Sequence, residues 1–470
     1  MARRSRELQA PPYPPQVQPR PVPERAAFGA ALRRRCPRKG HARWRPRSGR
    51  PDPVGVLVAS NKGRLQSLLP LRYARMMVSP FTFYRGAAAI MAGDLARTPA
   101  TGVRVQACGD CHLLNFGGFA TPERKLVFDI NDFDETAIAP WEWDVKRLVA
   151  SFVIAGQANR FGGTDCREAA WWAARRYREQ MLEYAQASVL GSWYAAVDLE
   201  ALVATRTDRD LRRFASRKAL ESIEAHDEHH ELHRLTHEEG DSPRITDAPP
   251  RVYHIDDLRT HERYRRRVER SFEEYRATLD PSRRVLLDRY RIVDVAIKVV
   301  GVGSVGTECG IALLVSGNGE PLFLQFKEAR MSVLEPYAGR SAWKHRGQRV
   351  VVGQRIMQAA SDVFLGWATW DDGRHMYIRQ LSDVKIKPVT ELMKPVNLCR
   401  YAKVCGWVLA RAHARSGDPV LLSAYMGKGS AFEDALSSFA VEYAHQNERD
   451  HARLVAAIRK GRIPADREVQ

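Results

Sequence analysis

A G-x-G-x-x-G pattern over residues 301–306 constrains the fold of this chain more than any other feature. Strand-like apolar segments flank it at 292–300 and 311–315, and a third follows at 322–326 after an Asn-Gly turn. A dinucleotide-binding fold requires a helix directly after such glycines, because the pyrophosphate lies on the helix N-terminus. The pattern therefore predicts an antiparallel hairpin and excludes that fold.

A glycine-rich hairpin with a Lys on the third strand is the nucleotide-binding arrangement of protein kinases. In those enzymes the loop covers the phosphates of ATP and the Lys grips them. Gly301, Gly303 and Gly306 are the candidate loop residues, and Lys327, at the end of the third segment, is the candidate Lys. The alternative is a plain glycine-rich turn with a surface Lys.

A phosphate-binding Lys of this type needs a carboxylate partner. Glu335 is the residue expected to pair with Lys327, and Glu328 is the alternative. Lys298 stands in a Val-Ala-Ile-Lys motif that matches the usual kinase Lys motif. Because it precedes the glycines, it lies on the wrong strand, and we interpret the match as a coincidence.

A second informative segment runs from 108 to 135 and is rich in acids and amides. In kinase-type phosphoryl transfer, an Asp orients the acceptor hydroxyl, while an Asn five residues later and a second Asp hold Mg²⁺. Asp110 is the candidate for the first role, and Asn115 and Asp129 for the second. Asp132 and Asp134 are close enough in the sequence to replace Asp129 as the metal ligand. The alternative is a polar turn whose side chains cap local backbone.

The same segment contains Cys108-x-x-Cys111-His112, which matches a haem attachment motif and half a zinc site. Covalent haem attachment requires an exported chain. A zinc site requires a second ligand pair, and the chain has no other Cys-x-x-Cys. Neither cofactor is expected.

The order of the two segments is unusual, because the acidic segment precedes the glycine loop by about 190 residues. Kinase-like chains have the opposite order, and a circular permutation would reconcile the two. The loop around Asp418 offers an alternative catalytic loop in the usual order. Ser423 stands five residues after Asp418, where an Asn is required, so we favour Asp110.

The positive charge is concentrated at the start of the chain. The formal net charge is +19, and residues 1–50 contain fourteen Lys and Arg against two acids. With its many prolines, residues 1–53 are expected to be a flexible tail that contacts nucleic acid at most nonspecifically. The remaining expected units are a helical lobe at 54–287, a β-rich nucleotide-binding lobe at 288–390 and a helical segment at 391–470 that completes the first lobe.

Several classes of protein are not expected from this sequence. No apolar run approaches the ~18 residues needed to cross a bilayer, and the start lacks the apolar region of a secretory signal. Seven scattered Cys are typical of reduced thiols. A cytoplasmic protein with no membrane partner is the expectation.

Five stretches resemble the bacterial domain of unknown function 2252 (DUF2252) family, over roughly residues 35–460. They are Ser79–Gly86, Cys108–Gly117, Phe128–Glu135, Lys298–Thr307 and Ala410–Asp418.

Members of that family look like distant relatives of aminoglycoside and choline phosphotransferases, and the resemblance implies a related loop. Residues of this chain match it at Gly109, Asp110, His112, Asn115 and Asp129. Cys108 departs from it, since a His usually stands at this position.

These observations predict an α+β, protein kinase-like fold of two lobes, circularly permuted. The predicted activity is a phosphotransferase dependent on ATP and Mg²⁺, with a small-molecule hydroxyl acceptor. A nucleotide-binding pseudoenzyme or regulatory module is one alternative. A metal-dependent hydrolase is another, built on His112, Asp129, Asp132 and Asp134.

Overall fold

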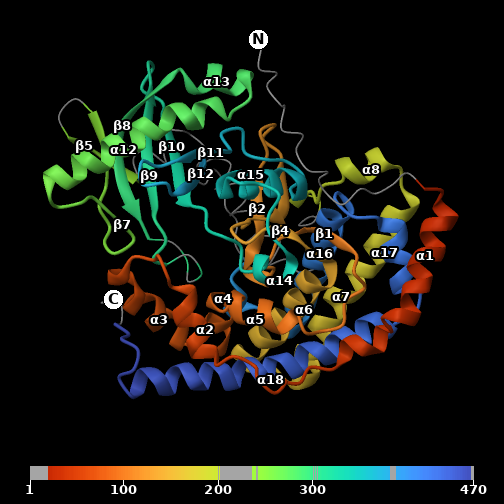
Figure 1. Ribbon diagram of the computed structural model, residues 1–470. Helices are drawn as coiled ribbons and strands as arrows, with labels where there is room; N and C mark the ends of the chain where they lie inside the picture. The colour runs from red at the N-terminus through yellow and green to blue at the C-terminus, as the bar shows by residue number, and fades with distance from the viewer. Residues whose placement is uncertain are drawn as a thin grey trace, which may run out of the picture.

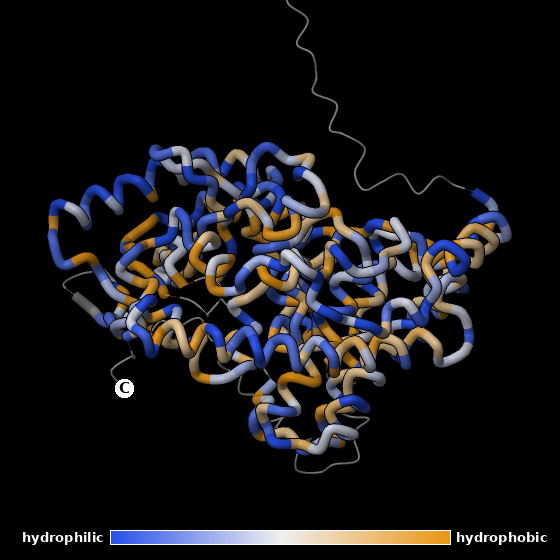
Figure 2. The backbone as a smooth tube through the Cα atoms, turned by 60° about the horizontal axis from the view of Figure 1, so that its bottom comes forward, coloured by the Kyte–Doolittle hydropathy of each residue, from blue (hydrophilic) through white to orange (hydrophobic). Residues whose placement is uncertain are grey.

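The computed structural model describes residues 20–199, 201, 235–239, 242–299, 301, 303, 305–381 and 388–466. They form an α+β structure of two lobes, a larger helical lobe and a smaller lobe around an antiparallel sheet (Figure 1). Hydrophobic stretches of the chain run mainly through the interior, and the outer helices are more hydrophilic (Figure 2). The α+β class expected from the sequence is confirmed.

Helices from both ends of the chain build the helical lobe. The N-terminal ones are α1 (Val22–Arg35), η1 (Arg38–Ala42), α2 (Pro53–Ser60), η2 (Gln66–Leu68), α3 (Leu69–Met77), α4 (Pro80–Gly86) and α5 (Ala88–Leu95). The middle ones are α6 (Trp141–Ala158), α7 (Gly163–Gln186) and α8 (Val189–Tyr194). The C-terminal ones are η4 (Thr390–Leu392), α16 (Pro395–Ala414), α17 (Pro419–Met426) and α18 (Ala431–Arg459).

Helices α7 and α16 pack closely against each other in this lobe. A Cβ at Gly406 of α16 would lie 2.3 Å from the carbonyl oxygen of Ala173 in α7. Only glycine allows the two backbones to approach so closely. This contact fixes α16, which in turn contacts the strand that precedes the acidic loop.

The smaller lobe contains a six-stranded antiparallel sheet in the order β11-β12-β10-β9-β8-β7. Consecutive strands β8, β9 and β10 confirm the three strands predicted from the sequence. The strands are β7 (Val252–Tyr253), β8 (Tyr290–Lys298), β9 (Cys309–Ser316), β10 (Pro321–Glu328), β11 (Gly366–Thr369) and β12 (His375–Gln380). Helices α14 (Glu335–Ala338) and α15 (Arg346–Met357) connect β10 to β11.

The sheet lobe begins earlier in the chain than the predicted boundary at residue 288. Helix α12 (Leu258–Ala277) packs Tyr264, Val268 and Tyr275 into a core shared with the strands. The few apolar residues of this helix stand among many charged ones, a pattern that by itself is typical of a solvent-exposed helix. The neighbouring elements are α13 (Pro281–Leu287), β5 (Thr236–Glu239) and β6 (Ser242–Ile245).

Two short hairpin-like pairs hold the acidic segment against the helical lobe. Strand β1 (Arg104–Ala107) pairs with β4 (Ala137–Pro140), and β2 (Phe116–Ala120) pairs with β3 (Leu126–Ile130). The short helix η3 (Leu113–Asn115) lies directly before β2. The acidic residues are therefore at the ends of short, buried strands.

The expectation of a flexible tail over residues 1–53 is wrong for the part that the structure describes, from residue 20 onward. Helix α1 packs on α17, and basic side chains of α1 and η1 donate to backbone oxygens at the C-terminal end of α17. The pairs are Arg33 with the carbonyls of Ala424 and Tyr425, and Arg38 with that of Met426. Helix ends leave such carbonyls without intrahelical partners, and cations are favourable there.

None of the helices in the described residues has the length and apolar character needed to cross a membrane.

The α7–α16 contact gives a stability prediction. Gly406→Ala should lower the free energy of unfolding by about 1 to 3 kcal/mol, because the added Cβ overlaps a backbone carbonyl that cannot move freely. Chemical denaturation monitored by circular dichroism measures this. Gly429→Ala is the control, since a Cβ there meets nothing within 4 Å. Equal effects of the two substitutions would contradict the prediction.

Candidate functional site

Backbone hydrogen bonds to a buried carboxylate brace the acidic loop. The amides of Cys108 and Gly109 donate to the two oxygens of Asp144, in the first turn of α6, at 2.6 and 2.9 Å. Gly109 has φ +87°, and a Cβ there would lie 2.2 Å from the carbonyl oxygen of Glu135. His413 Nε2 lies 3.3 Å from Asp144 Oδ2. The loop at Cys108 and Gly109 is therefore braced through Asp144.

Asp110 projects from this loop with its side chain 19% exposed. Arg147 Nε donates to Asp110 Oδ1 at 2.7 Å, and the same guanidinium contacts the carboxylate through Nη2. Asn115 Nδ2 donates to the carbonyl of Asp110 at 2.6 Å. Burial raises the pKa of Asp110, although Arg147 opposes the shift. A carboxyl with a raised pKa is a better proton acceptor than an ordinary Asp.

His112 lies beside Asp110, with its Nε2 3.9 Å from Asp110 Oδ2. Burial, and then the nearby Arg85, hold the pKa of His112 well below its ordinary value. The imidazole is therefore neutral near pH 7.

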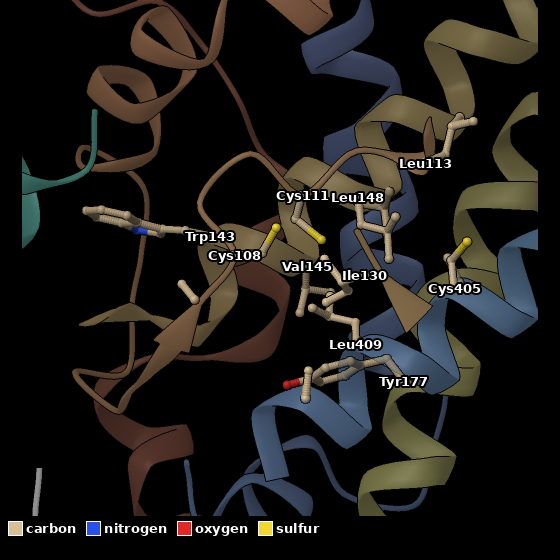
Figure 3. Close-up of a cluster of buried hydrophobic side chains, with 14 of the residues drawn as sticks. Cys108, Cys111, Leu113, Ile130, Trp143, Val145, Leu148, Tyr177, Cys405 and Leu409 are labelled. Carbon is tan, nitrogen blue, oxygen red and sulfur yellow. The ribbon is translucent and has the colours of Figure 1, made fainter. Parts of the chain in front are cut away.

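The sulfur atoms of the loop lie in the hydrophobic core. Cys108 and Cys111 are fully buried beside Ile130, Val145 and Leu148 (Figure 3). Burial raises the pKa of the Cys111 thiol well above its ordinary value. All seven Cys residues, each of them described, are free thiols. These positions give no exposed thiolate for haem or zinc.

Lys327, on β10, forms an ion pair with the acidic segment, not with the expected partner. Its Nζ lies 2.7 Å from Asp134 Oδ2, and Tyr377 donates to Asp134 Oδ1 at 2.5 Å. Burial alone would raise the pKa of Asp134, but Lys327 outweighs it and the pKa falls to about 2.

The prediction that Glu335 pairs with Lys327 is therefore wrong. Glu335 accepts from the amide of Ser332 at 3.0 Å and lies 3.8 Å from Arg349. The alternative, Glu328, lies 3.9 Å from Arg330. Asp134 is 193 residues from Lys327 in the chain, so no local pattern indicated the pair.

The structure separates the acids proposed for the metal. Asp129 is fully buried and points into the protein, where Arg411 Nη2 lies 2.6 Å from its Oδ1 and the amide of Ala359 donates to its Oδ2 at 2.8 Å. Asp132 and Asn115 line the cavity described below. Arg411 and the amide of Ala359 thus occupy the Asp129 carboxylate, which is directed away from the cavity, whereas Asp132 lines it.

A cavity of about 1270 Å³ lies between the lobes and brings most of the predicted site residues together. The helical lobe contributes Asp110, His112, Asn115, Asp132 and Asp134, and the sheet lobe contributes Lys298, Gly301, Gly303 and Lys327.

The glycine loop lies over the acidic loop. A Cβ at Gly303 would lie 4.0 Å from Asp110 Oδ2. Arg64, which precedes α3, donates to the carbonyls of Gly303 and Val305 at 2.8 and 2.6 Å. Gly306 has φ +86° and accepts a hydrogen bond from the amide of Leu65 at 2.7 Å. No sequence pattern indicated a role for Arg64, because it is one Arg among many.

Asp418, the alternative catalytic residue, does not line this cavity. It caps the N-terminus of α17 through the amides of Val420 and Leu421, and it forms an ion pair with Arg25 at 2.9 Å. Its role is structural.

The donor set fits a hard cation with few protein ligands. Among the residues that the structure describes, no group of three or more His, Cys, Asp or Glu side chains is placed to hold a metal ion. Mg²⁺ usually keeps several waters and needs one or two carboxylates plus substrate phosphates. Asp132 and Asn115 are residues of this chemical type that line the cavity, whereas the four-residue hydrolase site expected as an alternative is not assembled among the described residues.

The model of one protein family, described as "Uncharacterized protein conserved in bacteria (DUF2252)", matches residues 64–457. No curated protein and no solved structure matches the chain.

Glu135 provides a pH prediction. Burial raises its pKa to about 7 from an ordinary 4.5. Between these values the folded chain binds more protons at this site than the unfolded chain, so its contribution to stability decreases as pH rises. Glu135→Gln removes this penalty. The free energy of unfolding of the variant minus that of the wild type should therefore increase from pH 5 to pH 8.

Denaturant titrations at the two pH values measure this difference. Glu123→Gln, the same chemical change at an exposed position between β2 and β3, is the control. If the difference in unfolding free energy between Glu135→Gln and the wild type is the same at both pH values, the raised pKa of Glu135 is contradicted.

Proposed function

The chain belongs to the uncharacterized bacterial DUF2252 family, and we propose that it is a phosphotransferase with a permuted kinase-like arrangement that uses Mg·ATP to phosphorylate a small-molecule hydroxyl. One observation carries the proposal. Asp110, Asn115 and Asp132 meet Lys327 and the glycine hairpin in one cavity, although about 190 residues separate the two groups in the chain. Kinase chemistry requires these side-chain types together.

Each lobe would have a separate part in this reaction. The glycine hairpin and Lys327, on the third consecutive strand of the sheet, would hold the phosphates. Asp132 and Asn115 would hold Mg²⁺ against them. Bound Mg·ATP would supply the phosphoryl group.

Asp110 would accept the proton of the acceptor hydroxyl. Its raised pKa supports this role, and so does the brace from Asp144, which fixes the loop. A positioned base contributes about 10² to 10⁴ in rate.

A second candidate function is a nucleotide-binding module without transfer. The Arg147–Asp110 ion pair favours it, because a carboxylate held by a guanidinium is a weaker proton acceptor. In that case Mg·ATP would bind, but no acceptor in a broad panel would be phosphorylated.

Direct binding is the first test of the proposal. Calorimetry and thermal shift of the full chain should show ATP binding that depends on Mg²⁺. A ligand at 100 times its Kd adds about 2.7 kcal/mol of stability, which is readily detected. Failure to bind Mg·ATP in both experiments would refute both candidate functions.

Lys327→Met should weaken Mg·ATP binding by at least about tenfold, because a hydrogen bond to a charged group contributes about 1.5 to 3 kcal/mol. Lys298→Met is the matched control, since it also removes a cavity-lining cation, and it should change the affinity little. Calorimetric titration with Mg·ATP measures both, and a thermal melt checks that each variant is folded. A larger effect of Lys298→Met would reverse the strand assignment.

The three acids should respond differently to amide substitution. Asp110→Asn should leave Mg·ATP binding nearly intact and abolish transfer. Asp132→Asn should weaken nucleotide binding only when Mg²⁺ is present. Asp129→Asn should lower thermal stability, because it disrupts a buried ion pair with Arg411, a change that typically costs about 3 to 5 kcal/mol.

Calorimetry with and without Mg²⁺, together with melting curves, separates these outcomes. If Asp129→Asn melts like the wild type but loses Mg²⁺-dependent binding, the metal belongs at Asp129 and the assignment to Asp132 is wrong.

A further inference from the structure

One wall of the cavity is formed by a segment of the chain that contains basic residues and no acidic residue. Residues 53–93, which form α2 to α4 and most of α5, contain no Asp or Glu. Their five cations all line the cavity: Lys62, Arg64, Arg72, Arg75 and Arg85. A wall of this composition is unusual for a buried surface, because buried charges are normally paired.

Two of these guanidinium groups bind neutral oxygens only. Arg72 donates to Asn61 Oδ1 at 2.6 Å and to the carbonyl of Gly86 at 3.0 Å. Arg64 donates to two carbonyls of the glycine loop. Burial lowers the pKa of Arg64 to about 10 and that of Arg72 to about 9, and neighbouring cations add to both shifts. Arg64 and Arg72 therefore form no ion pair with a carboxylate of the described residues.

Arg85, in the last turn of α4, has no hydrogen bond or ion pair to the described residues, and its Nε is buried. Its Nη2 lies 3.9 Å from the Cβ position of Gly301. The Cβ position of Gly303 lies 3.5 Å from the carbonyl oxygen of Arg85 and 4.0 Å from Asp110 Oδ2. The Arg85 guanidinium therefore lies against Gly301, and the backbone carbonyl of Arg85 and the Asp110 carboxylate both lie beneath Gly303.

Arg147 already pairs with Asp110, so Arg85 is not needed as its counter-ion. Asp110 is the residue that would contact the acceptor hydroxyl, whereas Lys327 and Asp132 would serve the nucleotide. Arg85 lines the same cavity as Asp110, and Asp110 is the carboxylate whose charge acts on Arg85 most strongly, which favours a position of Arg85 on the acceptor side.

We propose that the acceptor is an anionic hydroxyl compound, and that Arg85 binds its phosphate or carboxylate group. Arg85 is then a residue that determines acceptor specificity. The wall formed by residues 53–93 supplies the positive field that attracts such a compound into the cavity. This inference rests on the proposed phosphotransferase function.

The test uses the full chain saturated with Mg²⁺ and a non-hydrolysable ATP analogue, titrated in a calorimeter. The probes are glycerol 3-phosphate, D-glycerate and glycerol, which carry a phosphate, a carboxylate and no charge. At least one of the two anions should bind at least tenfold more tightly than glycerol, and the better one identifies the group that the site prefers.

Arg85→Met should weaken the binding of that anion by at least about tenfold, and Arg85→Lys should restore part of it. The affinity for the ATP analogue should stay within about threefold of wild type. Arg251→Met is the control, since it removes another cavity-lining cation, and it should change anion binding by less than about threefold.

Three results would overturn the inference. The anions could bind no better than glycerol, or Arg251→Met could weaken them as much as Arg85→Met. Alternatively, Arg85→Met could weaken the ATP analogue instead of the anions, which would assign Arg85 to the nucleotide. If the analogue does not bind but the anions still bind the free chain through Arg85, the phosphotransferase function fails and the anion site stands.

Discussion

The ion pair between Lys327 and Asp134 is the contact on which the arrangement of the two lobes depends. Lys327 comes from the centre of the sheet and Asp134 from the loop after β3; the Lys327 side chain is buried and that of Asp134 is partly buried. Burying two charges is costly unless their remaining hydrogen-bonding positions are also satisfied. Tyr377, on the strand next to Lys327, satisfies the second oxygen of Asp134. Arg349 of α15 adds a hydrogen bond to the carbonyl of Asp134 at 2.8 Å. Strand β10, strand β12 and helix α15 are thereby tied to one short acidic segment.

Features that depend on local chemistry were predictable from the sequence. The glycine pattern between two apolar segments predicted the β8–β9 hairpin, because chain direction and turn residues are local properties. The spacing of Asp110 and Asn115 indicated a structured loop, and a hydrogen bond does join the Asn115 side chain to the backbone of Asp110. Lys327 was identified from its position on the third strand. These predictions needed no knowledge of distant contacts.

Features decided by residues far apart in the chain were not predictable. Asp129 and Asp132 are both Asp residues of the same short segment, so the sequence does not distinguish their roles. The ion pair with Arg411, 282 residues away in the chain, accompanies the burial of the Asp129 carboxylate. The basic N-terminal helix was misjudged for the same reason. Arg33 and Arg38 have no acidic residue near them in the sequence, but their guanidinium groups donate to backbone carbonyls at the end of α17. Charge composition alone cannot distinguish a solvated Arg from one that caps a distant helix.

The balance of charge in the cavity links the fold to the proposed chemistry. Of the described residues that line it, eleven are Lys or Arg and five are Asp or Glu. Lys327 is neutralised by Asp134, and Arg147, outside the lining, neutralises Asp110. Five of the eleven cations belong to the wall formed by residues 53–93, where Arg64 and Arg72 donate to backbone and amide oxygens. Mg·ATP carries only about two net negative charges and would be held mainly by the sheet lobe. A second anion next to Asp110 would compensate the charge that the nucleotide leaves on the opposite wall, and this requirement follows from the arrangement of charges in the fold itself.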